Sequence, residues 1–417
     1  MYKMEKEQIK SSILNKLKTK KIVLFGGGIT AQNFYIEYKN NINIIKCVSN
    51  ISKEWGEGNL CGEIDITKFD MSIIDSETYI VCCSIVAFDL IERQLKEKGL
   101  KVYDDFIDYR IAKAVLKDLP IIIFYGTCVL RDIYNIIDKY DIFNENFASI
   151  FTQSGVHQAI VTNRILIHAL KICDVFVYTP KILDRDSMYS VSREMLPSDC
   201  KMISVSNLVV SIYWPQCSKK IDDYNEFYLH TYSSYRDLRF YHTMFRKSEN
   251  NINKMVIEGV KISEIAKRLS DEDFYSEKDV KRNFNSSMKL IQLAEKKVDI
   301  VVSDYINDNC KDIWLYQNYI HPNKVVIGEY TKRLLKELGV SDIKFDAYLD
   351  TLPEHIHEGG DVPIYPSVIK HLGLSCVDEK QRWRILTSDG IKLMTFNEYV
   401  EYYAEYTVKA IEIMNMW

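Results

Sequence analysis

The stretch 121–128 reads Ile-Ile-Ile-Phe-Tyr-Gly-Thr-Cys and decides the fold of the larger part of this chain. An apolar run that stops at Gly126 predicts a buried strand followed by a tight turn. Helical spacing resumes over residues 129–138, so the stretch predicts a strand-turn-helix unit. Cys128 would then lie at the carboxyl end of a parallel sheet, where open α/β sheets bind their ligands.

Further strands and helices alternate after this unit. Apolar runs predict three strands and one helix, over residues 148–152, 174–178, 201–205 and 161–171. The chain then becomes mainly helical, with Ser276 as the first residue of a capping box and a helix over 323–338 that ends at Gly339. Strands that alternate with helices indicate a parallel sheet with crossover helices.

The first part of the chain shows the same alternation. Residues 6–18 have the spacing of an amphipathic helix, and residues 21–31 predict a strand, a glycine-rich turn and a helix start. Three more strands and one helix are predicted over 42–48, 79–84, 101–103 and 88–98. Because Pro120 disfavours helix in the residue before it, we expect a Rossmann-like domain over residues 1–117 and a second domain over 118–417.

The turn Gly26-Gly27-Gly28-Ile29-Thr30-Ala31 fits the dinucleotide-binding pattern, with alanine in the last glycine position. Gly26 and Gly28 would let backbone N–H groups face a phosphate at a helix N-terminus. Ser49, however, stands near the place of the acid that holds a ribose. A site for NAD or another nucleotide and a tight turn that binds none both stay open. The domain also resembles small Rossmann-like modules of surface-polysaccharide and sugar-modifying enzymes, with Ser49 replacing the Asp of their Val-Asp-Asn.

The composition disfavours several classes of protein. A net charge of −4 over 417 residues, without a long Lys/Arg run, gives no attraction to nucleic acid. No stretch approaches the roughly 18 consecutive apolar residues of a membrane span, and the first residues lack the apolar segment of a signal peptide. The ten cysteines show no CxxC pair and no zinc-like spacing, and Cys82 and Cys83 adjoin in an apolar run. This pattern predicts a cytoplasmic protein with no metal site.

Cys128 is the strongest candidate for a nucleophile. Its sulfur would lie near the N-terminus of the helix predicted over 129–138, where the helix dipole stabilises a thiolate. The backbone N–H groups of the same turn could receive an oxyanion. The alternative is a buried, inert cysteine, which is the commoner state of a free thiol. Asn207, just after a predicted strand, could donate to the oxyanion or to an acceptor sugar, or belong to a packed loop.

His321 offers a base for this thiol. The sequence Asn318-Tyr-Ile-His321-Pro-Asn, followed by a predicted helix, is similar to the last block of SGNH hydrolases, where an Asp three residues before the His orients it. Asn318 takes that place here. A neutral amide can orient an imidazole but stabilises the imidazolium less than a carboxylate does, which suits a thiolate nucleophile. Asp304 or Asp312 could be the orienting acid instead.

Two other polar stretches are weaker candidates. His355 and His357 have the spacing of two metal ligands on a strand, but no third ligand is identifiable nearby. The Gly-Gly-Asp sequence that soon follows favours a surface loop. The basic and aromatic run 232–242 could contact phosphates, although it is too short to indicate a nucleic-acid interface.

Three stretches, 274–306, 318–322 and 362–372, together with the turn Gly126-Thr127-Cys128-Val129, carry a family resemblance. From about residue 120 to about residue 375 the chain resembles the polysaccharide-biosynthesis acetyltransferases typified by the capsule protein WcbI, which bind coenzyme A. The family motif is Gly-Asn-Cys-Gln, so Gly126 and Cys128 match and their neighbours differ. The resemblance implies an α/β fold with an SGNH-like second domain and a helical C-terminal portion. It also implies a coenzyme A site at Gly126 and Thr127.

These features predict an acyltransferase. Cys128 would attack the thioester of acetyl-CoA, and His321 would assist deprotonation and then activate a hydroxyl on a bacterial surface polysaccharide or its precursor. Direct transfer with His321 as the base is a second route. Two further hypotheses are an SGNH-type carbohydrate esterase, and a non-catalytic module that binds a sugar nucleotide or coenzyme A in a polysaccharide-biosynthesis complex.

Overall fold

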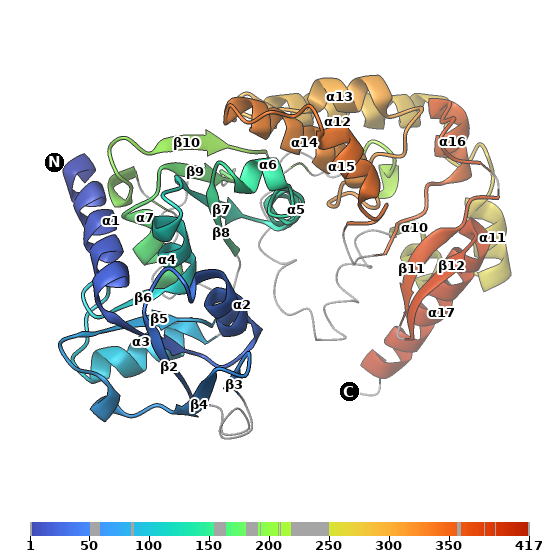
Figure 1. Ribbon diagram of the computed structural model, residues 1–417. Coiled ribbons are helices and arrows are strands. Elements are labelled where there is room, and N and C mark those ends of the chain that lie inside the picture. Colours follow the sequence, from blue (N-terminus) through green and yellow to red (C-terminus); the bar gives the residue numbers. More distant parts are fainter. Residues whose placement is uncertain are drawn as a thin grey trace. The chain divides into compact units, whose positions relative to one another are not determined.

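Figure 1 shows the computed structural model of the chain. The structure describes residues 2–50, 59–84, 87–153, 164–180, 193–206, 210–217, 250–356, 360–378, 380–387 and 389–415, and the single residues 191 and 208. The chain forms two compact units. Unit 1 comprises residues 1–125, 141–178 and 185–203, and unit 2 comprises residues 126–140, 179–184 and 204–417. The domain division expected after residue 117 stays a prediction.

The first sheet of unit 1 has six strands in the order β3-β4-β2-β1-β5-β6. Their bounds are Lys21–Phe25 (β1), Ile44–Ser49 (β2), Asn59–Leu60 (β3), Ile64–Lys68 (β4), Thr78–Cys82 (β5) and Phe106–Asp108 (β6). All adjacent pairs are parallel except β3 with β4. The central strands β1 and β5 consist almost entirely of buried side chains, as a sheet covered on both faces requires. Without the short β3, the order β4-β2-β1-β5-β6 matches the first five strands of the Rossmann order 3-2-1-4-5-6.

Four helices accompany this sheet: α1 (Tyr2–Thr19), α2 (Ile29–Tyr38), α3 (Phe88–Glu97) and α4 (Tyr109–Leu116). In Figure 1, α1 runs beside α4, against which it packs. Asp108 caps α4 by accepting the backbone N–H of Arg110 at 2.9 Å. The helix ends before Pro120, as the sequence predicts.

One predicted strand is wrong. Residues 101–103 form no strand, apart from a single bridge between Val102 and Phe106. Asp105 donates its backbone N–H to the carbonyl of Lys101 at 2.8 Å, so the chain turns there, and Tyr103 adopts a φ of 68°. The last strand of the sheet is β6, which begins only at Phe106. The strand begins later than predicted because this local turn prevents residues 101–103 from extending. Val102 and Tyr103 are too few apolar residues to specify a strand alone.

The second sheet has four strands in the order β10-β9-β7-β8. Their bounds are Ile121–Gly126 (β7), Ala148–Gln153 (β8), Val175–Tyr178 (β9) and Lys201–Ser204 (β10), with α6 (Asp141–Asn144) and α7 (Arg164–Leu170) between them. β7 pairs with β9 in parallel, and Val205 just past β10 forms a parallel bridge with Ile300. This is a flavodoxin-like order, which places the topological switch point at the carboxyl ends of β7 and β9.

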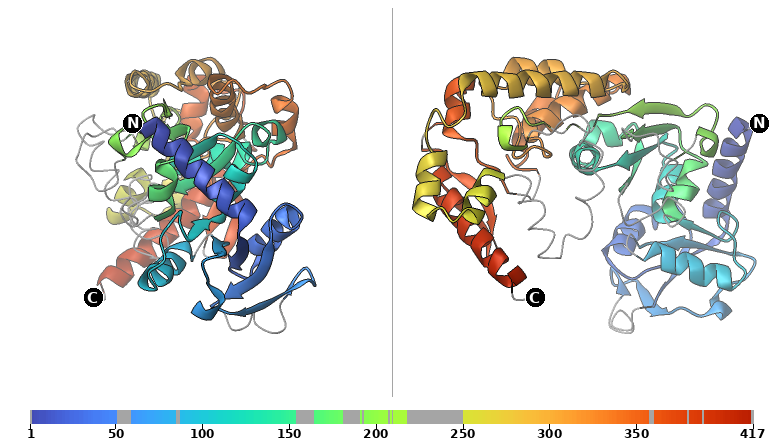
Figure 2. Two further views of the ribbon diagram at one scale, coloured as in Figure 1. Left: turned by 60° about the vertical axis from the view of Figure 1, so that its left-hand side comes forward. Right: turned by 180° about the vertical axis from the view of Figure 1, so that it is seen from behind.

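Unit 2 is mainly helical, which confirms the expected helical C-terminal portion. Its helices are α5 (Cys128–Ile137), α10 (Asn250–Ile257), α11 (Ile262–Leu269), α12 (Glu277–Glu295), α13 (Ser303–Asn309), α14 (Lys324–Glu337), α15 (Phe345–Thr351), α16 (Pro366–Leu372) and α17 (Phe396–Asn415). A hairpin of β11 (Trp383–Thr387) and β12 (Gly390–Met394), absent from the predicted elements, packs against α17, as the second view of Figure 2 shows in red.

Short 3-10 turns complete the described elements, at Met71–Ile73, Arg193–Met195 and Pro215–Cys217. Ser276 caps α12 as predicted, since its Oγ accepts the backbone N–H of Asp279 at 3.2 Å. α14 ends before Gly339, whose φ of 72° also matches the prediction. None of the described helices combines the length and apolar character needed to cross a bilayer.

The glycine-rich turn after β1 gives a test of this packing. Gly26 and Gly99 both have positive φ, 125° and 85°, so alanine is strained at either position. At Gly26 a Cβ would also lie 2.7 Å from the carbonyl oxygen of Cys83, whereas at Gly99 nothing lies within 4 Å. We expect Gly26→Ala to lower the free energy of unfolding by about 2 kcal/mol more than Gly99→Ala does. Urea unfolding followed by circular dichroism measures the difference, and equal losses would contradict the packing role.

Candidate functional site

Cys128 occupies the turn that the sequence predicts for it. β7 ends at Gly126, Thr127 is the extended N-cap residue, and Cys128 is the first residue of α5. A Cβ at Gly126 would lie 2.5 Å from Thr179 Oγ1 and 2.7 Å from Leu130 Cδ2. Glycine at this position therefore allows the residue that follows β9 to contact the end of β7. Cys128 itself is 5% exposed.

Polar groups without described partners surround this turn. The hydroxyls of Thr127 and Thr179 are both buried and bond to no other described residue. Thr127 makes no side-chain cap bond to α5, so the N–H groups of the first helical turn have no cap from it. The dipole at a helix N-terminus favours negative charge, whether a thiolate or an oxyanion. The turn thus combines a thiol, two buried hydroxyls and the N-terminus of a helix.

Cys128 is the first residue of α5, and His321 lies just before α14. The two helices pack against each other. Near their C-terminal ends, Tyr140 donates its hydroxyl to the carbonyl of Ser341 at 3.2 Å, and Tyr348 donates to the carbonyl of Ile136 at 2.7 Å. These contacts join the C-terminal end of α5 to α15 and to the segment after α14.

Asn318 orients the ring of His321, and its hydrogen bonds show which end of its amide faces that ring. Its Oδ1 accepts the backbone N–H groups of Ile320 and His321, both at 3.0 Å. Its Nδ2 lies 3.2 Å from His321 Nδ1 and donates to the carbonyl of Gly360 at 3.3 Å. Since the amide oxygen is held by two N–H groups, the amide NH₂ faces the ring. His321 Nδ1 is thereby an acceptor, and the ring proton belongs on Nε2.

This tautomer bears on the roles expected for the pair. A general base that works through Nε2 needs its proton on Nδ1, which is the arrangement an Asp at position 318 would stabilise. The neutral Asn318 instead leaves an N–H at Nε2, suited to donate to a sulfur or an oxyanion. The two carboxylates considered as alternatives are engaged elsewhere: Asp304 with Arg333 at 2.7 Å and Asp312 with Ser375 at 2.7 Å.

Three polar residues beside this pair were not predicted from the sequence. Gln317 and Asp361 are 0% and 6% exposed, and Arg384 lies on β11. Gly360 brings them together, because a Cβ there would lie 2.9 Å from the carbonyl oxygen of Arg384. The only signal in the sequence was position, since Gln317 adjoins Asn318 and Asp361 follows Gly360. Arg384 could not be linked to them without the hairpin.

Gly26 and Gly28 lie in unit 1, whereas Cys128 and His321 lie in unit 2. Gly26 packs on the carbonyl of Cys83, and Gly28 is the N-cap of α2. Asn50, in the region of the expected ribose-binding acid, donates its side-chain N–H to Gln94 Oε1 at 2.7 Å. The close packing on Cys83 gives this turn a structural role, and a nucleotide site there stays a prediction.

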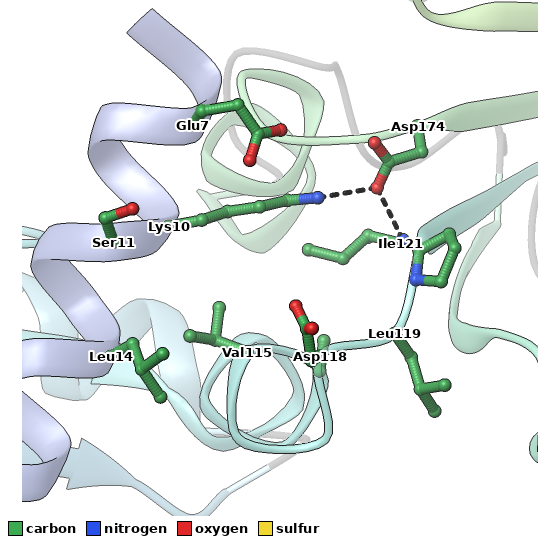
Figure 3. Close-up of a pocket in the computed structure, with 11 residues that line it drawn as sticks. Glu7, Lys10, Ser11, Leu14, Val115, Asp118, Leu119, Ile121 and Asp174 are labelled. Carbon is green, nitrogen blue, oxygen red and sulfur yellow. Dashed lines mark hydrogen bonds and ion pairs between the residues drawn. The ribbon is translucent and has the colours of Figure 1, made fainter.

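Unit 1 contains a cavity of about 230 Å³ at the amino end of β7. Figure 3 shows the residues that line it. Ile121, the first residue of β7, lines it, as do Lys10 and Asp174. Asp174 binds Lys10 at 2.7 Å and the backbone N–H of Ile121 at 2.8 Å. Lys10 and Asp174 are thus paired with each other, and the residues that line the cavity include neither Cys128 nor His321. We assign it a structural role.

Several expectations fall outside the described residues: Asn207, His357 and the run 232–242. His355 is described, and its Nδ1 lies 2.9 Å from Gln317 Nε2. Within the described ranges, no three or more His, Cys, Asp or Glu side chains are grouped so as to hold a metal ion.

The family model described as polysaccharide biosynthesis enzyme WcbI matches residues 122–342, more than half of the chain. The chain belongs to the WcbI family. The matched region begins within β7 and includes both Cys128 and His321. Comparison with curated protein sequences gives no match.

A solved structure of WcbI also resembles this chain. It is described as a novel polysaccharide biosynthesis enzyme, in its native form without a disulfide bond between coenzyme A and one of its cysteines. The TM-score is 0.52 at 14% identity, over 70% of this chain and 90% of the other. At this level of identity the likeness shows a shared fold.

The tautomer of His321 can be tested with one substitution. Asn318→Asp keeps one oxygen for the two backbone N–H groups and places the second beside His321 Nδ1. We expect the ring proton to move to Nδ1, because the carboxylate accepts a hydrogen bond there. Nitrogen NMR of histidine-labelled protein reports the tautomer. Asn285→Asp adds the same charge at an exposed position of α12 and should leave the tautomer unchanged. An unchanged tautomer in Asn318→Asp would contradict the assignment.

Proposed function

We propose that this chain transfers an acyl group, with acetyl the expected one, from coenzyme A to a sugar hydroxyl in the synthesis of a bacterial surface polysaccharide. The observation that carries the proposal is the place of Cys128, at the N-terminus of α5 and beside the switch point of the second sheet. Membership of the WcbI family supports the polysaccharide context. A WcbI structure described with coenzyme A and a cysteine supports a thiol beside the cofactor.

In the first step the Cys128 thiolate attacks the thioester carbonyl carbon of the acyl-CoA. A new carbon–sulfur bond forms while the carbonyl π electrons move to oxygen. The N–H groups at the start of α5 stabilise this oxyanion. Collapse of the tetrahedral intermediate breaks the bond to the coenzyme A sulfur, and its thiolate leaves with that electron pair. Gly126 and Thr127 belong to the coenzyme A site in this proposal.

In the second step a sugar hydroxyl attacks the acyl-cysteine. Its oxygen bonds to the acyl carbon, the Cys128 sulfur leaves, and the hydroxyl proton is taken up at that sulfur. His321 donates its Nε2–H to the developing negative charge, in the tautomer that Asn318 stabilises. The covalent route is favoured over direct transfer because an Nε2–H imidazole cannot act as the base at that nitrogen.

Cys128→Ala tests the covalent route. Incubation with acetyl-CoA should add the mass of one acetyl group to the parent protein and none to Cys128→Ala, whose transfer rate should fall roughly a hundredfold or more because the nucleophile is absent. Cys61→Ser, at an exposed cysteine of unit 1, is the matched control and should acetylate like the parent protein.

Full transfer by Cys128→Ala would contradict the covalent route. If His321→Gln were then inactive, direct transfer with His321 in the reaction would replace it. Release of acetate from an acetylated glycan without coenzyme A would instead favour an esterase. These three outcomes separate the routes that the sequence leaves open.

A further inference from the structure

Five residues of unit 2 form a connected group that the proposed acyl-transfer steps do not use: Trp314, Gln317, His355, Asp361 and Arg384. Gln317 Nε2 lies 2.9 Å from His355 Nδ1, whose ring packs edge-on to Trp314 with centroids 6.3 Å apart. Asp361 and Arg384 are joined twice through the backbone, with Asp361 Oδ2 and the Arg384 carbonyl each accepting an N–H at 2.7 Å. We call this group the Trp314–Arg384 cluster.

Four buried polar atoms of the cluster have no hydrogen-bond partner among the described residues. They are two acceptors, Gln317 Oε1 and Asp361 Oδ1, and two donors, Trp314 Nε1 and Arg384 Nη1. Gln317 and Asp361 are 0% and 6% exposed, so bulk water does not satisfy them. An unsatisfied buried polar atom is unfavourable and uncommon in a folded protein. The four atoms belong to residues of one connected group, and a ligand with hydroxyl groups would supply the missing bonds.

The charges of the cluster favour a neutral ligand. Burial raises the pKa of Asp361 to about 6 against the opposing effect of Arg384, so the carboxylate is ionised at neutral pH. Burial, together with Arg384, lowers the pKa of His355, which keeps that ring neutral. A negative ligand would meet Asp361 and a positive one would meet Arg384. Hydroxyl groups, which both donate and accept, satisfy two donors and two acceptors together.

The cluster lies next to the candidate catalytic pair. Asn318, which orients His321, directly follows Gln317 and donates to the carbonyl of Gly360, the residue before Asp361. The backbone N–H of Val362 in turn binds the carbonyl of Gln317 at 2.8 Å. The half-buried Trp314 offers an aromatic surface for the C–H face of a sugar ring.

We propose that the Trp314–Arg384 cluster is the acceptor subsite, which binds the hydroxyls of a neutral saccharide beside His321. Asp361 and Gln317 accept hydrogen bonds from the sugar, and Arg384 and Trp314 donate to it. The assignment of this saccharide as the acyl acceptor rests on the proposed function, whereas its binding does not.

The test measures saccharide binding and coenzyme A binding separately on the full chain. The probes are the methyl glycosides of glucose, galactose, mannose, rhamnose and N-acetylglucosamine, followed by saturation-transfer NMR and by the indole N–H signal of Trp314, with coenzyme A binding measured by calorimetry. We expect at least one neutral glycoside to bind and to shift the Trp314 signal. Methyl glucuronide and methyl glucosaminide, which carry opposite charges, should bind more weakly.

Arg384→Gln and Asp361→Asn should each weaken glycoside binding roughly tenfold, since each alters one hydrogen bond to a charged group. Arg384 has no described side-chain partner, so its variant should fold normally, and Asp361→Asn keeps an oxygen for the backbone N–H of Arg384. Arg382→Gln, next to the same strand with a half-exposed side chain, is the control and should leave binding unchanged.

Unchanged glycoside binding in both variants, or binding of no glycoside by the parent protein, would overturn the subsite. All three variants should bind coenzyme A like the parent protein. If the parent protein binds a glycoside through Arg384 but does not bind coenzyme A, the subsite stands and the proposed acyl transfer fails.

Discussion

The close approach of the chain at Gly126 is the constraint on which the candidate site depends. Because position 126 carries no side chain, Thr179 and Leu130 occupy the space where a Cβ would project. The strand β7 can then pass into α5 within one residue, and Cys128 falls at the first position of that helix. A longer turn would move the thiol away from the helix N-terminus and from the end of β9. The same contact brings the buried hydroxyls of Thr127 and Thr179 to the turn.

The second constraint is the use of both ends of the Asn318 amide. Its oxygen closes the turn before α14 by accepting two backbone N–H groups, and its nitrogen holds both the imidazole and the carbonyl of Gly360. Asn318 therefore links the turn that carries His321 to the segment that carries Asp361. In the proposed acyl transfer, the amide would make the imidazole a hydrogen-bond donor at Nε2 and not a base.

Much of the fold could be predicted because local sequence controlled it. The strands β1, β5 and β7 are buried on both faces, so their apolar runs are unmistakable, and Gly339 and Ser276 mark helix ends by their own chemistry. The displaced strand at residues 101–103 shows the limit, because a turn closed by Asp105 outweighs a short apolar pair. The position of Cys128 at the strand-to-helix turn could be predicted from the apolar run before it. The contact of Asn318 with His321 could be predicted from their spacing of three residues. Which end of the Asn318 amide faces the His321 ring could not be predicted from the sequence, because it depends on two backbone N–H groups and on the carbonyl of Gly360. The Trp314–Arg384 cluster was also beyond prediction, because Arg384 reaches it only through the hairpin of β11 and β12.

A crystal structure of the full chain with coenzyme A tests the central claim most directly. The account predicts that the coenzyme A sulfur lies within about 4 Å of Cys128 Sγ, with the N–H groups at the start of α5 facing the position of the acyl oxygen and His321 Nε2 facing the sulfur. Coenzyme A bound at the Gly26–Gly28 turn of unit 1, or held in unit 2 with its sulfur turned away from Cys128, would contradict it.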